Sequence, residues 1–447
     1  MDALAALREA AGEVIETSLC DVQGNWLALV NTQEGKRLAF AAKGEAALSA
    51  LWKDVEKEAD VKDVHVSVMA LNANNAALVR RYVKWTAPTA CGTKGASIGF
   101  SDWLGEADAV VAELFGKRQL KPVLVDFTTE DSEALQRYFV QAVDTATWGV
   151  LEEGYKEGYG ANAAGLKTEE EIVKALLYGY SMIGFDCSDK IDLGIEKLSD
   201  EAVDKRFEQF NETFRAALHA SYLNAEFKVG TSKITFTENQ LHRIVLEYGE
   251  AIMHIQFIYN SYLKNTPWDI DFELDLSKPG KVLTPQEHYL IGNELQRNGI
   301  KLSSICLDPL KDAEAVNDNL QLHCEIADTF GYRLSFKNAD IAMEDTAAAM
   351  KYLKGKVHFK MNNILWMSAI ELAKALDADM FGKLCAACGC EATADAADRA
   401  LVLGYRKALN PKEEGNVAAD MKAFLEAHHA EYAAAIKENV AAQLKNI

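Results

Sequence analysis

Between residues 92 and 370 the chain repeats one pattern, a short apolar run followed by a polar loop and an amphipathic stretch. The apolar runs have strand length, and the stretches between them have helical periodicity. The candidate strands are 96–100, 123–127, 159–163, 181–186, 234–236, 270–276, 302–307, 332–336 and 356–360. Such regular alternation predicts a parallel sheet, and this many units predict a (β/α)8 barrel rather than an open sheet. No glycine-rich phosphate loop follows any candidate strand, which argues against a dinucleotide-binding fold.

Several of the intervening helices carry recognisable start or stop signals. Thr284-Pro-Gln-Glu combines a Thr cap, a Pro at the first helical position and a Glu three residues after the cap. A long amphipathic helix is expected over 239–264. Two further helices are expected over 314–330 and 344–353, ending at Gly331 and near Gly355.

The two ends of the chain differ from this central pattern. The first part contains short strand candidates at 13–19, 25–30, 37–40 and 63–69, with helices expected over 46–57 and 74–84. The last part is rich in alanine, and a final helix is expected over 416–445. We therefore expect an N-terminal α+β domain over 1–90, the barrel over 91–390 and a helical extension over 391–447 that packs on the barrel.

The composition limits the class of partner. The formal net charge of the 447 residues is -20, whereas nucleic acids and anionic membranes require clustered Lys and Arg. A small anionic ligand remains compatible, because one Lys or Arg inside a pocket can outweigh the overall charge. A homo-oligomer is left open.

The chain shows no export signal and no apolar stretch of membrane-spanning length, so a cytoplasmic protein with reduced cysteines is expected. The closely spaced Cys385, Cys388 and Cys390 resemble part of a metal site. However, no second Cys/His pair follows nearby, which favours small thiols packed at a helix end over a zinc site.

In a (β/α)8 barrel, ligands bind where the strands end and the following loops begin. This rule selects charged and amide side chains at Asp126, 162–167, Asp186, 275–278, Asp308, 337–340 and 358–363. Such side chains suit a hydroxyl-rich anion. The alternative is that many of them only cap the next helix, since Asp and Asn are preferred caps.

Long motifs in the chain resemble the tagaturonate/fructuronate epimerase family of keto-uronate epimerases. The segments are Ser97-Ile-Gly-Phe-Ser-Asp-Trp-Leu-Gly, the block 146–172, Gly184-Phe-Asp-Cys-Ser-Asp, the stretch 284–301 and Val357-His-Phe-Lys. The resemblance covers nearly the whole chain, is strongest over 97–370, and identifies it as a divergent member.

The resemblance implies a divalent metal, Zn or Mn, held by three histidines, and this chain departs from that pattern. Gly165 and Lys337 stand where two of the histidines are expected, and only His358 is retained as a metal ligand. An acidic pair of the family falls on Ser277 and Lys278. No resident metal is therefore expected, since one histidine cannot hold a divalent ion unaided.

The implied chemistry explains why this departure matters. The two sugar acids differ at a carbon one removed from the ketone, whose C–H is not acidic. Retro-aldol cleavage, rotation and re-addition would invert that carbon through an enolate that needs a positive group to stabilise it. Lys337 could supply that charge, or form a Schiff base if burial lowers its pKa.

The sequence therefore predicts a keto-hexuronate epimerase or isomerase with a remodelled metal site. The expected catalytic residues are His358, Lys337, Lys167, Asp186 and Glu273. The expected substrate-binding residues are Lys360, Asn162, Asp126 and Asn338. Two alternatives stay open: an inactive relative that binds a sugar acid or a protein partner, and an enzyme for a different small anion.

Overall fold

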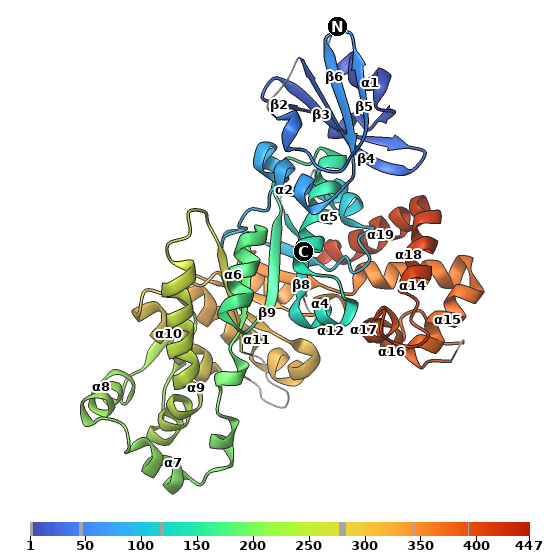
Figure 1. The fold of residues 1–447 in the computed structure, drawn as a ribbon. Helices are drawn as coiled ribbons and strands as arrows, with labels where there is room; N and C mark the ends of the chain where they lie inside the picture. Colours follow the sequence, from blue (N-terminus) through green and yellow to red (C-terminus); the bar gives the residue numbers. More distant parts are fainter. Residues whose placement is uncertain are drawn as a thin grey trace.

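The computed structural model describes residues 3–43, 48–116, 118, 120–276, 283–343, 346–391 and 393–447. For 311–317 and 446 only the backbone is described. The parts of the molecule are, along the chain, an antiparallel sheet, a parallel barrel with a helical arm, and a group of C-terminal helices (Figure 1).

The centre of the molecule is a closed barrel of parallel strands, which confirms the predicted fold class. Its strand order is β10-β13-β14-β15-β16-β7-β8-β9. The strands are β7 (Ser97–Phe100), β8 (Lys121–Thr128), β9 (Gly160–Leu166), β10 (Met182–Asp186), β13 (Asp271–Asp275), β14 (Ser304–Leu307), β15 (Arg333–Phe336) and β16 (Val357–Met361). The candidate strand at 234–236 is the exception. It lies at the end of β12 (Ser232–Ile234), which pairs antiparallel with β11 (Phe227–Val229) outside the barrel.

Helices surround the barrel, and their boundaries follow the local signals. Thr284 and Glu287 form a reciprocal capping box at the start of α10 (Pro285–Arg297), because each side chain satisfies an otherwise unpaired backbone N–H of the first turn. The others are α3 (Asp108–Phe115), α4 (Thr129–Leu135), α5 (Phe139–Glu153), α6 (Glu169–Tyr178), α9 (Glu238–Ile258), α11 (Pro309–Phe330), α12 (Ala339–Ala342), α13 (Thr346–Tyr352), α14 (Ile364–Leu376) and α15 (Ala378–Cys388). α11 therefore begins five residues before the predicted 314, at a Pro that follows the cap Asp308.

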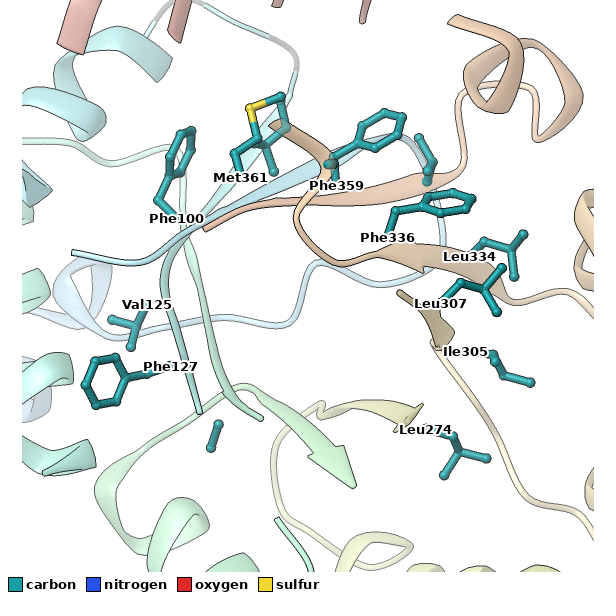
Figure 2. Packing of buried hydrophobic residues seen from close by; sticks show 14 of the residues in the cluster. Phe100, Val125, Phe127, Leu274, Ile305, Leu307, Leu334, Phe336, Phe359 and Met361 are labelled. Carbon is teal, nitrogen blue, oxygen red and sulfur yellow. The ribbon is translucent and has the colours of Figure 1, made fainter. Parts of the chain in front are cut away.

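Apolar residues at alternate strand positions form the core between the barrel and its helices. Figure 2 shows Leu274, Ile305 and Leu334 pointing away from the ring of strands, and each is buried. Because strand side chains alternate between faces, the residues between these positions must point into the barrel. The interior is therefore polar, and its buried residues include Asp126, Asn162, Glu273, Ser304, Arg333, Ser335, His358 and Lys360.

The N-terminal part forms a separate antiparallel sheet of order β1-β3-β4-β6-β5, with β2 beside β3. Its elements are α1 (Ala3–Ala10), β1 (Glu13–Val14), β2 (Cys20–Val22), β3 (Asn25–Thr32), β4 (Gly35–Lys43), β5 (Val55–Val61), β6 (Val64–Met69) and α2 (Ala73–Tyr82). The helix predicted over 46–57 is wrong, because its last residues begin the edge strand β5. The side chains of β5 are mostly exposed and include Glu56, Lys57 and Glu58, which is the composition of a solvent-facing edge.

A helical arm follows β10, and further helices follow the barrel (Figure 1). The arm contains α7 (Asp200–Phe207), α8 (Glu212–Tyr222), the β11–β12 hairpin and α9. The C-terminal helices are α16 (Arg399–Leu403), α17 (Tyr405–Ala408), α18 (Ala418–Ala427) and α19 (His429–Gln443). The single helix predicted over 416–445 is broken at His428, whose Nδ1 lies 2.9 Å from the carbonyl oxygen of Phe424. Within the described residues, no helix has the length and apolarity needed to cross a membrane.

Candidate active site at the barrel mouth

A cavity of about 280 Å³ opens at the carboxyl ends of the barrel strands, near the lower end of the size range of small-molecule sites. Its lining is Asp126, Thr128, Glu130, Asp131, Ala164, Asp308, Leu310, Lys337, Asn338, Lys360, Asn362, Asn363, Leu403, Tyr405 and Arg406. Four of the predicted site residues, Asp126, Lys337, Asn338 and Lys360, are in this set. The cavity is thus built from strand ends, as the barrel rule requires, together with residues from the C-terminal helices.

Lys360 lies between two buried carboxylates. Its Nζ is 2.5 Å from Glu273 Oε1 and 3.8 Å from Asp126 Oδ1. Ser304 donates a hydrogen bond to the other Glu273 oxygen at 2.9 Å, and Asn162 donates one to Asp126 at 2.9 Å. Two carboxylates therefore share one ammonium group at the bottom of the cavity, where the three side chains are almost removed from solvent. Such burial is tolerated because each charge also has polar partners.

This arrangement sets the protonation of the three groups. Burial alone lowers the pKa of Lys360, but Asp126 and Glu273 outweigh it and keep the pKa above its ordinary value. Burial raises the pKa of Asp126 even though Lys360 opposes the shift. Burial also acts to raise the pKa of Glu273. However, Lys360 and other neighbours outweigh burial and bring this pKa below its ordinary value. The geometry thus favours charged Lys360 and Glu273, and makes Asp126 the carboxylate that accepts a proton more readily.

A glycine makes room for Asp126. A Cβ added at Gly99 would lie 2.7 Å from Asp126 Oδ2. Because no side chain can be accommodated there without displacing the carboxylate, Gly99 permits Asp126 to occupy the interior.

Lys337 follows β15 and forms an ion pair with Asp275 at the end of β13. Its side chain is 22% exposed, so the ammonium group can reach the cavity. Burial acts to lower the pKa of Lys337, but Asp275 outweighs it and raises the pKa well above its ordinary value. This is opposite to the lowered pKa that a Schiff-base lysine needs, so the structure favours Lys337 as a fixed positive charge.

Amide side chains hold the loops around the two lysines. Asn363 donates a hydrogen bond to Asn338 at 3.1 Å and to Asp340 at 3.1 Å. Asn362 donates one to Asp126 at 3.3 Å. These bonds join the loop after β16 to the loop after β15 and to β8, and so fix the rim of the cavity.

His358 lies deeper in the barrel and is not among the cavity-lining residues. It is paired in register with Ser97 at the start of β7, and its Nδ1 lies 2.9 Å from Ser97 Oγ. Arg333 donates a hydrogen bond to the same hydroxyl at 2.7 Å. Burial, aided by Arg333, lowers the pKa of His358 to about 3. The imidazole is therefore neutral, and among the described residues its buried Nε2 has no hydrogen-bond partner.

Two other predicted residues lie at the edge of the mouth. Lys167 is 43% exposed, with Nζ 3.5 Å from Asp186 and 3.3 Å from Asp189. Gly165, two residues earlier, has φ +71° and contains no ligand atom beyond its backbone. Ser277 and Lys278, where the family's acidic pair was expected, lie outside the described residues.

Sequence reasoning missed the contribution of the C-terminal helices to the rim. Tyr405 donates a hydrogen bond to Asp131 at 2.6 Å, and Arg406 Nε donates one to the same oxygen at 2.8 Å. The ring of Tyr405 stacks on Trp103, with centroids 3.4 Å apart. These contacts join segments more than 270 residues apart, and no local signal at 405–406 indicates them.

The closed parallel barrel, with a charged cavity at the carboxyl ends of its strands, defines a (β/α)8-barrel protein. The chain belongs to the tagaturonate epimerase family, whose family model matches residues 15–431. It is 27% identical over 383 residues to the tagaturonate/fructuronate epimerase of Thermotoga maritima, a match that covers 83% of this chain and 78% of that protein. The resemblance seen in the motifs is thereby confirmed.

Solved structures show the same fold. The native fructuronate-tagaturonate epimerase of Cohnella laeviribosi superposes with a TM-score of 0.87 at 23% identity, covering 99% of each chain. A glycerol complex of that enzyme gives the same TM-score and covers 99% of this chain and 97% of that chain.

Proposed function

We propose that the protein interconverts keto-hexuronates of the tagaturonate/fructuronate type at the barrel mouth, with lysine ammonium groups in the role that the family gives to a metal. The observation that carries this proposal is Lys360 held between Asp126 and Glu273 at the wall of the cavity, with Lys337 beside it. Membership of the tagaturonate epimerase family supports the reaction class.

The metal that the resemblance implies does not fit the described residues. Gly165 offers no side chain and Lys337 offers a cation. His358 faces Ser97 with Nδ1, and its unpartnered Nε2 would be the single imidazole donor left from the family's three. The nearby carboxylates of Glu273 and Asp275 are each engaged by a lysine. A divalent ion would need neutral or anionic donors that converge on one point. We infer that the metal site is remodelled.

These groups have the chemical properties that a retro-aldol epimerisation needs. Removal of the proton from the hydroxyl on the epimerising carbon requires a base, and Asp126, with a pKa raised by burial, suits that task. The bond to the carbon next to the ketone then breaks, its electron pair makes the ketone an enolate, and the hydroxyl carbon becomes an aldehyde. Lys337 or Lys360 would stabilise the enolate oxygen. Rotation of the aldehyde and bond formation on its other face return the epimer and the proton.

The substrate carboxylate has candidate partners at the rim. Arg406 is a cavity residue, and so is Asn338. Arg406 is already hydrogen-bonded to Asp131 and Glu130. It would therefore contact the substrate carboxylate through the guanidinium N–H groups that these two bonds leave available. We propose Asn338, Asn162 and Lys360 as binding groups. His358 and Lys167 would support the site from below and from its edge, with Asp186 orienting Lys167.

The test is turnover by the full chain after chelation. Purified protein is incubated with tagaturonate in EDTA, and fructuronate is measured by NMR, with parallel samples in Mn²⁺ and Zn²⁺. We expect epimerisation in EDTA and its loss in Asp126→Asn. The exposed Asp379→Asn on α15 is the matched control and should remain active. Turnover that requires added metal would overturn the lysine role.

The second candidate is a non-catalytic relative that binds a sugar acid. It is favoured by the pairing of Lys337 and Lys360 with carboxylates, because paired lysines can bind without reacting. This alternative would be established if calorimetry shows that tagaturonate binds and NMR shows no conversion in any of the conditions tested.

We further propose a cytoplasmic location, which the eight free cysteines support.

A further inference from the structure

Two imidazoles meet in the helical arm, away from the barrel mouth. His219 belongs to α8 and His242 to α9, and their Nε2 atoms are 2.8 Å apart. The ring of Phe207 on α7 stacks on both, at 3.8 Å from the His242 ring and 5.5 Å from the His219 ring. Packing against Phe207 therefore holds both imidazole rings, with their Nε2 atoms directed toward each other.

A carboxylate orients one of these rings. His242 Nδ1 lies 2.7 Å from Asp204 Oδ1. A carboxylate accepts, so Nδ1 of a neutral ring carries the hydrogen and Nε2 presents its lone pair to His219. This carboxylate–histidine arrangement is the one that fixes histidine ligands in metal sites.

A third donor lies one helical turn away. Glu238 precedes His242 by four residues on α9, and this spacing places both on one face. One carboxylate oxygen of Glu238 and the nitrogens of the two histidines all lie within 4.8 Å of one another. His242 is buried, His219 is half-buried and Glu238 is exposed, so an ion would reach the group from solvent through Glu238.

We propose that His219, His242 and Glu238 form a Zn²⁺ site that links α8 to α9, with water as the fourth ligand. Two nitrogens and one carboxylate oxygen suit tetrahedral zinc, with Zn–N distances of about 2.0–2.1 Å and therefore nitrogens about 3.3 Å apart. The present separation is 2.8 Å, and a small rotation of the partly exposed His219 can provide the difference. Without metal, His219 donates its Nε2 hydrogen to His242, so the site is stable in both states.

A zinc ion at this site would stabilise the structure of the helical arm and would not take part in the chemistry of the sugar acid. The arm leaves the barrel after β10 and returns to it through α9 to β13, and both strands contribute acidic residues, Asp186 and Asp275, to the mouth region. The contact between His242 and Asp204 connects α7 to α8 and α9 at the same site. A bound ion would therefore stabilise three helices that lie between two barrel strands.

None of these three ligands was singled out in the sequence, where the cysteine cluster was a metal-like motif for which packed thiols were favoured over a zinc site. Cys385, Cys388 and Cys390, at the end of α15, are not part of this set. Among the described residues, the group with converging donor atoms is the His219, Glu238 and His242 group.

The experiment measures zinc binding by the full chain. Protein stripped with EDTA and dialysed is titrated with ZnCl₂ against a chromophoric chelator. We expect one tight site per chain, and at least tenfold weaker binding in His219→Gln and in His242→Gln. His429→Gln, an exposed histidine on α19, is the matched control. Unchanged stoichiometry and affinity in the His219→Gln/His242→Gln double variant would overturn the proposal.

Two further measurements identify the ligands even where a variant folds poorly. Co²⁺ bound to the wild-type protein should give visible bands of a tetrahedral nitrogen and oxygen site, with no thiolate charge-transfer band. Zinc should raise the thermal unfolding midpoint of the wild-type protein and of Cys385→Ser/Cys388→Ser/Cys390→Ser equally. A thiolate band, or loss of the shift in the cysteine variant, would assign the metal to the cysteines instead. None of these readouts depends on epimerase activity.

Discussion

The ammonium group of Lys360 lies 2.5 Å from a carboxylate oxygen of Glu273, and the two side chains are 3% and 1% exposed. Their strands, β16 and β13, are separated in the barrel by β14 and β15, so the pair spans the interior. A charge pair removed from water this completely is costly unless every partner is present. The stability of the barrel and the chemistry of its mouth therefore depend on the same side chains.

Lys360→Met should lower the free energy of unfolding by about 3–5 kcal/mol, because it leaves Glu273 and Asp126 buried without their cation. The measurement is equilibrium unfolding in guanidinium chloride, with the transition followed by circular dichroism and fluorescence.

The control for this variant is Lys383→Met on α15, whose side chain is 51% exposed and pairs with Asp379. Exposed pairs contribute at most about 1 kcal/mol, so Lys383→Met should be nearly neutral. Adding Glu273→Gln to Lys360→Met should restore part of the lost stability. Equal stabilities for Lys360→Met and Lys383→Met would show that the interior pair is not a strong constraint.

The stability of the protein should fall as the pH decreases from about 6.5 toward 4. His323 is a buried residue of α11, and burial lowers its pKa to about 4. Burial, aided by Arg333, lowers the pKa of His358 to about 3. In the unfolded chain both imidazoles take up a proton near pH 6.5. Between these values the unfolded state binds more protons, so each imidazole contributes up to about 1.4 kcal/mol per pH unit to the loss.

This dependence is measured by unfolding the protein at pH 7, 6, 5 and 4.5. His358→Gln should reduce the slope of the free energy of unfolding against pH, and His323→Gln should do the same. The exposed His429→Gln should keep the wild-type slope. A wild-type slope in both buried-histidine variants would mean that other groups cause the acid sensitivity.

The barrel and much of its polar interior were predictable from the sequence, for one physical reason. Strand residues alternate between faces. In β13 and β16 polar residues alternate with apolar ones, and in β8 Asp126 lies between Val125 and Phe127. Asp126, Glu273 and Lys360 could therefore be placed inside once the strands were recognised. Their pairing could not, because it depends on how far each strand is shifted relative to its neighbours.

Other features depended on contacts between distant parts of the chain. The sequence does not reveal that His358 lies low in the barrel, since depth follows from its register with Ser97. Val55 to Val61 was expected to begin within a helix, but the free edge of β6 makes it a strand. Ile234 and Phe236 alternate with polar residues as in a strand, yet Ile234 pairs with Phe227 in a hairpin outside the barrel. In each case tertiary contact decides between locally similar choices.

Gly165→His should destabilise the protein by about 1–3 kcal/mol, whether or not zinc is present. Gly165 has φ +71°, and an added Cβ would lie 3.0 Å from Thr129 Oγ1. L-residues adopt this left-handed conformation only with strain. Restoring the family histidine at this position therefore needs changes in the backbone at the end of β9, and a simple reversion should not regain metal affinity.

Thermal unfolding of Gly165→His and Gly165→Ala tests this expectation, since both variants should lose stability. Gly382→Ala is the control, because Gly382 lies inside α15 and an added Cβ there meets no atom within 4 Å. It should be neutral or stabilising by about 0.5–1 kcal/mol. A Gly165→His protein as stable as wild type that also binds zinc at the mouth would contradict the argument.

Lys337→Met should weaken the binding of tagaturonate by about tenfold or more. A charge-assisted hydrogen bond contributes about 1.5–3 kcal/mol, and about 1.4 kcal/mol is a factor of ten. The loss is reinforced because Asp275 would keep its negative charge near the cavity without its ion-pair partner Lys337. Isothermal titration calorimetry measures the dissociation constant directly.

Lys337→Arg keeps the charge and should retain most of the affinity. Lys167→Met removes a cation at the edge of the mouth and should have a smaller effect, because Lys167 is 43% exposed and already pairs with Asp186 and Asp189. If Lys167→Met weakens binding more than Lys337→Met in variants of equal thermal stability, the anion binds at the edge of the mouth and not in the cavity beside Lys337.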